Sequence, residues 1–258
     1  MHTETLPRGS RQTLDWLDRL SAPALRNWIL AGGTGLALQI GHRISEDFDF
    51  FRTDDMDARA LHDVFKAYGA YETLQEAEHT LTVRLDRTKL SFFCVRDPFL
   101  FGSLPYRFFT IADITDIALM KIAAISGRGS RKDFIDLFFI LSGPPFLAEK
   151  SGGLSREASS AAEAAMEDRM AFLASQGSAK MLRGKPQSAS LFLRQILELT
   201  IKKYGASRAN RYHLLKSLTY FDDAEREPMP QMLRAVDWNA CKRFFIQAAQ
   251  DVIMQLES

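Results

Sequence analysis

Short apolar runs and helical patterns alternate along the first half of the chain. Residues 28–31 form a short apolar run stopped by two glycines, which predicts a buried strand entering a tight turn. Residues 47–51 alternate acidic and aromatic side chains, as expected of a strand whose two faces differ. Further strands are predicted at residues 79–85, 89–95 and 106–111, and helices at residues 12–20, 36–43, 54–70, 113–125 and 131–141.

The clearest boundary in the chain is the Pro144-Pro145 pair, which follows the last of these helices. It divides the sequence into a predicted N-terminal domain, residues 1–145, and a helical C-terminal domain, residues 146–258. The predicted fold class is α/β (α+β), a small mixed sheet with helices followed by a helical C-terminal lobe. Helical periodicity returns at residues 191–204, 212–221 and 238–256, whereas residues 148–190, with a helix-compatible stretch at 155–174 and a linker at 177–190, receive no role.

Composition and charge limit the classes of partner. A hydrophobic content of 46% in 258 residues is enough for a globular core. Thirty-three basic residues against thirty-two acidic ones leave a net charge of +1, so any attraction to nucleic acid must be local. No stretch approaches about 18 uncharged apolar residues and the N-terminus lacks a signal-peptide core, so we expect a soluble cytoplasmic protein without a membrane partner.

The candidate chemistry begins at the glycine turn. Gly32 and Gly33 end a predicted strand, and the helix after them points its positive end at the same place, which suits a phosphate group. Thr34 adds a hydroxyl donor. Asp47 and Asp49 are two residues apart on a strand, so their carboxylates share one face and can bind Mg²⁺ together with substrate phosphates.

Each of these signals alone has an ordinary structural explanation. A single Gly-Gly-Thr is more often a simple turn, and a single Asp-x-Asp is usually solvated surface. Together they indicate a site, because the acids lie among bulky aromatics only about a dozen residues after the turn. His42, at the end of the predicted helix, is read as a residue that stabilises the negative helix end and is left out of the chemistry.

A second acidic motif follows on the predicted helices after residue 113. Lys121 lies on an apolar helix face, where it must either extend its amine to water or meet an anion. Asp133 and Asp136 are three residues apart and share a helix face; an ion-paired surface acid is the alternative interpretation. Arg128 and Arg131 form a basic patch beside them, suited to phosphates, although such patches are often only solvated.

These motifs resemble a known family. The stretch LAGGTGLALQIGHRISEDFDFF is similar to the abortive-infection toxin nucleotidyltransferases of the AbiEii/AbiGii type, a branch of the DNA polymerase β-like nucleotidyltransferase superfamily. In that family a helical lysine precedes a Lys/Arg-Asp-x-x-Asp motif, matched here by DIALMKIAAISGRGSRKDFIDL. YHLLKSLTYFDDAEREPMP also resembles family members, so the resemblance covers residues 25–145 and about 190–250.

The resemblance implies a polymerase β-like core and an enzyme that moves a nucleoside monophosphate from a nucleoside triphosphate to a hydroxyl. It implies Mg²⁺ on Asp47 and Asp49, triphosphate contacts from Lys121, and Asp133 as the active-site acid with Asp136 as its support. It also implies a tRNA 3′ end as acceptor, a toxic or phage-defence outcome, and an antitoxin partner. The nucleotide-binding residues expected are Gly32, Gly33, Thr34, Lys121, Arg128 and Arg131.

One departure from the superfamily is visible. Polymerase β-like enzymes usually carry a third carboxylate on a neighbouring strand, and the candidate strand, LSFFCV, has none. Either Asp133 takes the place of this carboxylate, as the toxin branch implies, or metal binding is weaker and the enzyme differs in rate or substrate. Two other functions also remain open. One is transfer to a protein or small-molecule acceptor, and the other is a non-catalytic nucleotide-binding regulatory module. Retention of both acidic motifs and Lys121 favours an enzyme.

Overall fold

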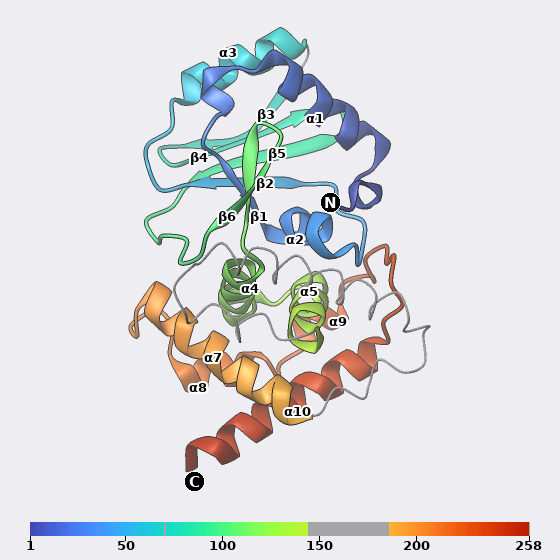
Figure 1. The fold of residues 1–258 in the computed structure, drawn as a ribbon, viewed down its shortest axis with the longest axis vertical. Helices are drawn as coiled ribbons and strands as arrows, with labels where there is room; N and C mark the ends of the chain where they lie inside the picture. Colours follow the sequence, from blue (N-terminus) through green and yellow to red (C-terminus); the bar gives the residue numbers. More distant parts are fainter. Residues whose placement is uncertain (70, 144–185, 258) are drawn as a thin grey trace, which may run out of the picture.

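A seven-stranded mixed sheet forms the upper lobe of the molecule (Figure 1). The structure is a computed structural model that describes residues 1–69, 71–143 and 186–257. Strand order is β3-β4-β5-β2-β1-β7-β6, and the pairs β2–β5 and β1–β7 are parallel while the others are antiparallel. The strands are β1 (Ile29–Ala31), β2 (Phe48–Arg52), β3 (Tyr71–Ala77), β4 (Thr80–Leu85), β5 (Thr88–Cys94), β6 (Ser103–Tyr106) and β7 (Phe109–Ala112).

One hydrophobic core lies between the sheet and two helices, α1 (Arg8–Leu20) and α3 (Ala58–Tyr68). Phe48 and Phe50 of β2 enter this core fully buried, together with apolar residues of β4 and β5. Because side chains alternate along a strand, Asp49 and Phe51 face the opposite side of the sheet. Phe51 packs there against the second core. The period-two pattern therefore sorts β2 as predicted, with aromatics inside and an acid on the other face.

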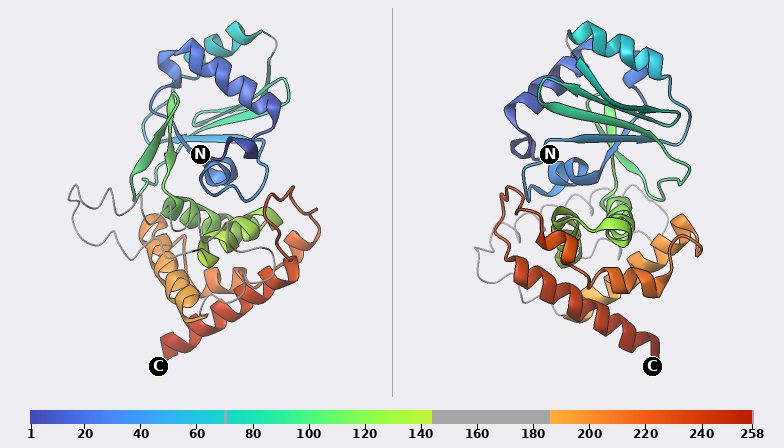
Figure 2. Two further views of the ribbon diagram at one scale, coloured as in Figure 1. Left: turned by 45° about the vertical axis from the view of Figure 1, so that its right-hand side comes forward. Right: turned by 180° about the vertical axis from the view of Figure 1, so that it is seen from behind.

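The second core belongs to a lower, helical lobe. Its helices α4 and α5 pack against the C-terminal helices, and helix α2 lies between them and the sheet (Figures 1 and 2). Two short 3₁₀ turns, Thr3–Thr5 and Pro23–Leu25, precede the sheet. The helices are α2 (Gly32–Ile40), α4 (Ile114–Arg128), α5 (Arg131–Ser142), α7 (Pro186–Tyr204), α8 (Arg211–Ser217), α9 (Asp222–Glu225) and α10 (Trp238–Glu257).

The segment before α10 joins the lobes. Arg43 and Met232 form an isolated antiparallel bridge, and the amide of Ile44 donates to the carbonyl of Gln231 at 2.8 Å. The carbonyl of His42 accepts from two amides farther along the same segment. C-terminal backbone thus fixes the chain between α2 and β2, which is where the candidate site residues lie.

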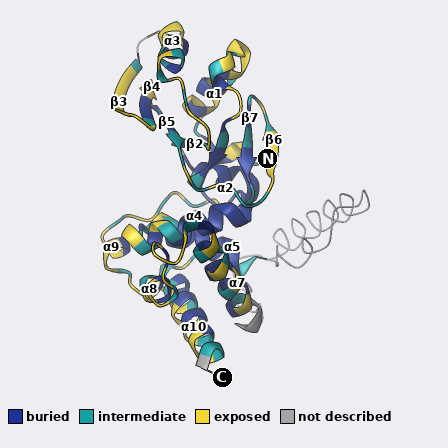
Figure 3. Cartoon of the chain, turned by 90° about the vertical axis from the view of Figure 1, so that its left-hand side faces the viewer, coloured by how far each residue is buried: buried dark blue, intermediate teal, exposed yellow. Residues whose placement is uncertain are grey.

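Most predicted elements are confirmed, with three corrections. The stretch 106–111 is two strands, β6 and β7, with a turn at Arg107, which has a φ of +52°. Strand β3 was not predicted, because it is an exposed edge strand without an apolar alternation (Figure 3). Helix α2 begins at Gly32, four residues earlier than predicted, so the glycines are its own first turn.

Two other expectations concern the chain beyond the sheet. The predicted helix at 155–174 and most of the linker at 177–190 lie outside the described residues, and the domain boundary at residue 145 stays a prediction. Among the described residues, α4 and α5 share a core with the C-terminal helices, so packing groups them with the lower lobe. None of the described helices has the length and apolar character required to cross a membrane.

Candidate active site

The paired aspartates lie against the start of helix α2. Asp49 pairs in register with Ala31 of β1, the residue directly before that helix. A Cβ added at Gly32 would lie 3.0 Å from the Asp49 carboxylate, and Gly32 has a φ of +63°, which favours glycine. The N-cap residue of α2, Ala31, makes no side-chain hydrogen bond, so no side chain at the cap position competes for the free amides of the first turn. The sequence-predicted pairing of turn and acids is therefore present.

Asp49 is a half-buried carboxyl whose pKa departs from its ordinary value. Its burial raises the pKa above the ordinary value, and the negative charge of Asp47 raises it further. Lys89, Lys121 and a hydrogen bond with Ser91 act in the opposite direction and do not fully compensate. A carboxylate that is desolvated beside a second carboxylate is stabilised by any cation that can reach both.

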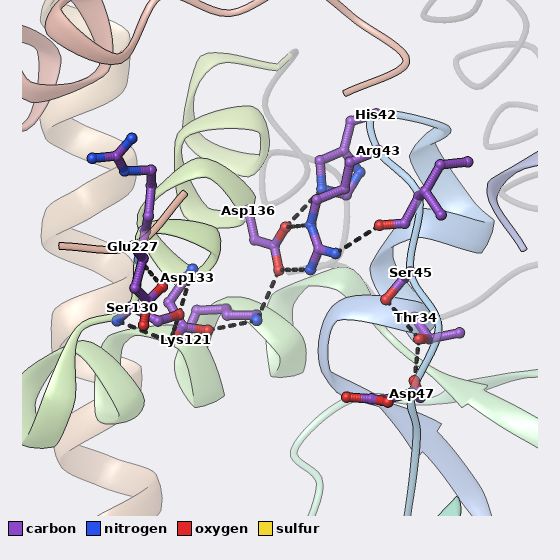
Figure 4. Close-up of polar contacts among 12 residues, drawn as sticks. Thr34, His42, Arg43, Ser45, Asp47, Lys121, Ser130, Asp133, Asp136 and Glu227 are labelled. Atoms are coloured by element: carbon purple, nitrogen blue, oxygen red, sulfur yellow. Dashed lines mark hydrogen bonds and ion pairs between the residues drawn. The ribbon is translucent and has the colours of Figure 1, made fainter. Parts of the chain in front are cut away.

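Thr34 holds the turn and the strand together. Its hydroxyl donates to the backbone carbonyl of Asp47 and lies 2.7 Å from the hydroxyl of Ser45 (Figure 4). Thr34 is buried, and its single proton is directed at Asp47 rather than at an external phosphate. Phosphate binding by the Thr34 hydroxyl stays a prediction, while the structure gives Thr34 the role of fixing Asp47 beside α2.

Gly33 is required for a different reason. A Cβ at Gly33 would lie 2.2 Å from Nη2 of Arg43, so the guanidinium occupies the space that any side chain would need. Burial lowers the pKa of Arg43, but Asp136 and, more weakly, Asp133 and Asp47 raise it above its ordinary value. The guanidinium therefore lies over the first turn of α2. No site role was predicted for Arg43.

Asp136 is the centre of a buried charged network. Its carboxylate accepts from Nε and Nη2 of Arg43 at 2.7 and 2.8 Å and from Nε2 of His42 at 2.7 Å, and Lys121 Nζ lies 2.8 Å away (Figure 4). Burial alone would raise the pKa of Asp136, but the charges of Lys121 and Arg43 and the hydrogen bonds from Arg43 and His42 lower it well below its ordinary value. Asp136 is therefore ionised, and these partners hold its carboxylate in one position.

His42 differs from its predicted role. Its fully buried ring bonds Asp136 on α5 instead of the end of α2. The carboxylate is an acceptor, so Nε2 carries the proton and donates, while Nδ1 is buried without a hydrogen-bond partner in the described structure. Burial lowers the pKa of His42, against the opposing effect of Asp136. The neutral ring therefore acts as a structural donor.

Lys121 joins the two acids of α5. Its amine donates to Asp133 at 2.7 Å as well as contacting Asp136, and burial is outweighed by these two carboxylates, which raise the pKa of Lys121. Asp133 closes a capping box with Ser130 at the start of α5. Lys121, Asp133 and Asp136 are thus brought together as predicted, with Asp133 partly open at 17% side-chain exposure and Asp136 at 0%.

The two predicted basic residues do not join this group. The guanidinium of Arg131 donates to the carbonyls of Ala224 and Glu225 and stacks on Trp238 at 5.0 Å. It is therefore directed at the C-terminal helices α9 and α10. Arg128 is exposed in the last turn of α4, and its nucleotide contact stays a prediction.

Strand β5 provides the neighbours that the sequence did not assign. It pairs in parallel with β2, so Ser91 stands beside Asp49. Lys89 lies two residues earlier, on the same face, with its Nζ 3.0 Å from Asp47 Oδ2. The position where a third carboxylate was expected thus carries a serine and a lysine. Only the strand register, which pairs Phe48 with Leu90, makes this neighbourhood visible.

The residues present fit a divalent cation that is coordinated partly by the protein and partly by the substrate. Among the described residues, no three His, Cys, Asp or Glu side chains gather as a self-sufficient metal site. Asp47 and Asp49 do supply two adjacent carboxylates whose mutual repulsion contributes to the raised pKa of Asp49. Mg²⁺ is commonly held by one or two carboxylates, waters and substrate phosphates. Two acids beside an uncapped helix start suit that arrangement.

Comparison with known proteins adds an independent observation. The family model described as "Nucleotidyl transferase AbiEii toxin, Type IV TA system" matches residues 16–255. An uncharacterised protein of Aquifex aeolicus is 36% identical over 140 residues, which is 53% of this chain and 67% of that protein.

Two solved structures have similar folds at low identity. A putative nucleotidyltransferase from H. pylori aligns over 97% of both chains with 15% identity and a TM-score of 0.49. MenT4, a nucleotidyltransferase toxin from Mycobacterium tuberculosis H37Rv, aligns over 95% of this chain and 86% of its own with 16% identity and a TM-score of 0.46.

Proposed function

The chain belongs to the AbiEii nucleotidyltransferase toxin family of type IV toxin–antitoxin systems, and from that premise we propose a specific reaction for it. The protein moves a nucleoside monophosphate from a nucleoside triphosphate to an acceptor hydroxyl, with Mg²⁺ bound by Asp47 and Asp49, and releases pyrophosphate. The observation that carries the proposal is the meeting of these two carboxylates with the uncapped start of α2. That geometry suits a phosphate and its metal together.

Different parts of the site supply the proposed phosphate contacts and the positive charge. The amides of Gly33 and Thr34 bind phosphate oxygens at the positive end of α2. Lys121, which is close enough to lower the pKa of Asp49, supplies positive charge on the opposite side of the same space. Mg²⁺, when bound, neutralises triphosphate charge and orients the reacting phosphorus. The leaving pyrophosphate carries away the negative charge that Lys121 and the helix start stabilise.

Asp133 is the proposed proton acceptor for the acceptor hydroxyl. As the hydroxyl oxygen forms its bond to the α-phosphorus, the proton passes to Asp133 and the bond to pyrophosphate breaks. Asp133 has the exposure that this role requires, whereas Asp136 is fully buried. Asp136 is instead a positioning residue, because it holds Lys121 and Arg43 in place.

The acceptor and the partner are proposals that go beyond the family membership. We propose that the 3′ end of tRNA is the acceptor, that its modification is the toxic event, and that a cognate antitoxin protein restrains it. The protein would act in the cytoplasm, where tRNA and nucleoside triphosphates are present. Arg128, exposed near Asp133, is the residue we propose for contact with phosphates of the nucleotide or the tRNA.

The test uses each labelled nucleoside triphosphate in turn with Mg²⁺ and total tRNA. Wild-type protein is expected to transfer label to tRNA, and Asp49→Asn to lose at least about 100-fold in rate, a loss typical of removing a group that stabilises transition-state charge. Asp63→Asn, an exposed acid on α3, is the matched control and keeps full activity. Parallel reactions with protein and aminoglycoside acceptors test the alternative acceptors. Equal labelling by wild type and Asp49→Asn would refute the assignment.

A further inference from the structure

Lys89 is the feature that the proposed reaction leaves unused. It lies on β5 beside the two aspartates, and its amine is 3.0 Å from Asp47. It precedes Leu90, the residue paired with Phe48, and therefore continues the same register next to Asp47. Lys89 is also the strongest influence that lowers the pKa of Asp49. One ammonium thus serves both carboxylates.

The same amine competes with a metal for these oxygens. Asp47 Oδ2 is the atom closest to Lys89, and a carboxylate oxygen shared with an ammonium is a weaker ligand for a divalent cation. The pair is also easily broken, because the side chains of Lys89 and Asp47 are 39% and 44% exposed. Ion pairs exposed to that extent contribute little to stability. The contact can therefore open when a metal enters without a large cost to the fold.

Once it has left Asp47, Lys89 can contact a phosphate bound on the same face of the sheet. The lysine side chain is long, flexible and half-exposed, and it begins on the face of the sheet that Asp49 shares with the start of α2. Phosphate oxygens bound to a metal on Asp47 and Asp49 would bring negative charge to that face. Lysine is a common phosphate partner in proteins, acting as a mobile point charge.

We propose that Lys89 is a phosphate-binding residue that Asp47 holds in reserve: it neutralises the metal-free aspartates and moves to the triphosphate once a divalent cation replaces it. This inference rests on the proposed function and assigns to β5 a cation in the place of the expected third carboxylate. It predicts opposite effects of one substitution on two ligands, since Lys89 competes with the metal but attracts the phosphate.

The experiment measures binding without turnover. Free Mn²⁺ is followed by electron paramagnetic resonance as it is titrated into protein, and inorganic triphosphate is then titrated at saturating Mn²⁺ by calorimetry. Lys89→Met is expected to bind Mn²⁺ up to about fivefold more tightly, the range of an exposed ion pair. It is expected to bind inorganic triphosphate about 10- to 100-fold more weakly, as for loss of one hydrogen bond between charged groups. Lys89→Arg keeps the charge and restores both affinities toward the wild-type values.

Two controls locate the effects. Lys66→Met removes another exposed lysine with an aspartate at 3.0 Å, on α3, and leaves both affinities unchanged. Asp49→Asn reduces Mn²⁺ binding if the metal occupies this site. A Lys89→Met protein that moves only one affinity, or neither, overturns the proposal. Opposite shifts in a protein that labels no acceptor would refute the proposed function and leave the assignment of Lys89 intact.

Discussion

Asp49 is half-buried and Asp136 is fully buried, and their surroundings shift the pKa values of the two carboxyl groups in opposite directions. Asp136 has Arg43, Lys121 and His42 within hydrogen-bonding distance, and its pKa is lowered well below the ordinary value. For Asp49, burial is the largest influence and raises the pKa, Lys89 lowers it and Asp47 raises it again, so that the net shift is upward. The charge of Asp136 is compensated by protein groups at hydrogen-bonding distance, whereas Lys89 and Lys121 compensate that of Asp49 only in part.

The difference separates a structural acid from a ligand-binding one. Burying a charged group is unfavourable unless partners compensate it, and Asp136 has them. Asp49 keeps an electrostatic deficit that a bound cation would remove. We interpret this incompletely compensated charge as the reason that the proposed reaction takes place beside β2. The network around Asp136 holds Lys121 and Arg43 near Asp49.

The largest expected effect comes from the satisfied acid. Asp136→Asn leaves Arg43 and Lys121 buried without their shared carboxylate, and removal of one partner from such a network costs about 3–5 kcal/mol of folding free energy. Urea denaturation measures it. Asp97→Asn, which loses a more exposed pair with Arg208, is the control and is expected to cost less than about 1 kcal/mol. If the two variants were equally stable, Asp136 would not be the centre of the network.

A smaller loss is expected where the network touches helix α2. Gly33→Ala places a methyl group against the Arg43 guanidinium, which must shift away from Asp136, at a cost of about 1–3 kcal/mol as for other overpacked sites. Gly102→Ala is the matched control, because nothing lies within 4 Å of a Cβ there. Thermal unfolding of both proteins gives the comparison. A Gly33→Ala protein as stable as Gly102→Ala would show that Arg43 has room to move.

The unsatisfied acid is expected to change stability in the opposite direction. The folded-state pKa of Asp49 is raised, so its carboxylate destabilises the folded protein at neutral pH and its protonated form does not. Asp49→Asn is therefore expected to gain about 0.5–2 kcal/mol while losing activity, a common exchange at functional sites. Denaturation at pH 7 without divalent metal tests it. If Asp49→Asn lowered the stability, Asp49 would stabilise the fold as Asp136 does, and the proposed difference between the two acids would be refuted.

The smallest effect is a pH dependence from His42. Its folded-state pKa lies below the unfolded value of 6.5, so the folded state resists protonation and stability falls as pH drops below about 6.5. The slope from one such group is at most about 1.4 kcal/mol per pH unit. His42→Gln retains a donor to Asp136 and does not titrate. Denaturation from pH 8 to pH 5 should show a shallower loss for this variant; parallel curves would exclude His42 as the source.

The sequence predicted the grouping of the candidate residues better than their contacts. Asp47, Asp49, Lys121 and Asp133 could be found because each lies in a local motif, where strand or helix periodicity fixes which face it occupies. Lys89 could not, because its relation to Asp47 depends on the parallel pairing of β2 with β5, which joins strands about forty residues apart in the chain. Non-local register has no signature in a single sequence.

Arg43 and Arg131 show the same limit from both sides. No site role was predicted for Arg43, yet its guanidinium lies against Gly33 in the first turn of α2. Arg131 was predicted to bind phosphates, yet it contacts the C-terminal helices. A sequence does not show which way a basic side chain points, because its partner depends on how the two lobes pack together. A histidine and arginine directly between a glycine-led helix and an Asp-x-Asp strand were the available signal for Arg43.

The backbone contacts of residues 231–234 with the segment from His42 to Ile44 also bear on the order of synthesis. A chain emerging from the ribosome presents the glycine turn and both aspartates well before residues 231–234, whose backbone fixes Arg43. Domains generally fold as units once their residues are available. The contacts that hold the candidate site together therefore form only after residues 231–234 have been synthesised, and products truncated before them lack these contacts.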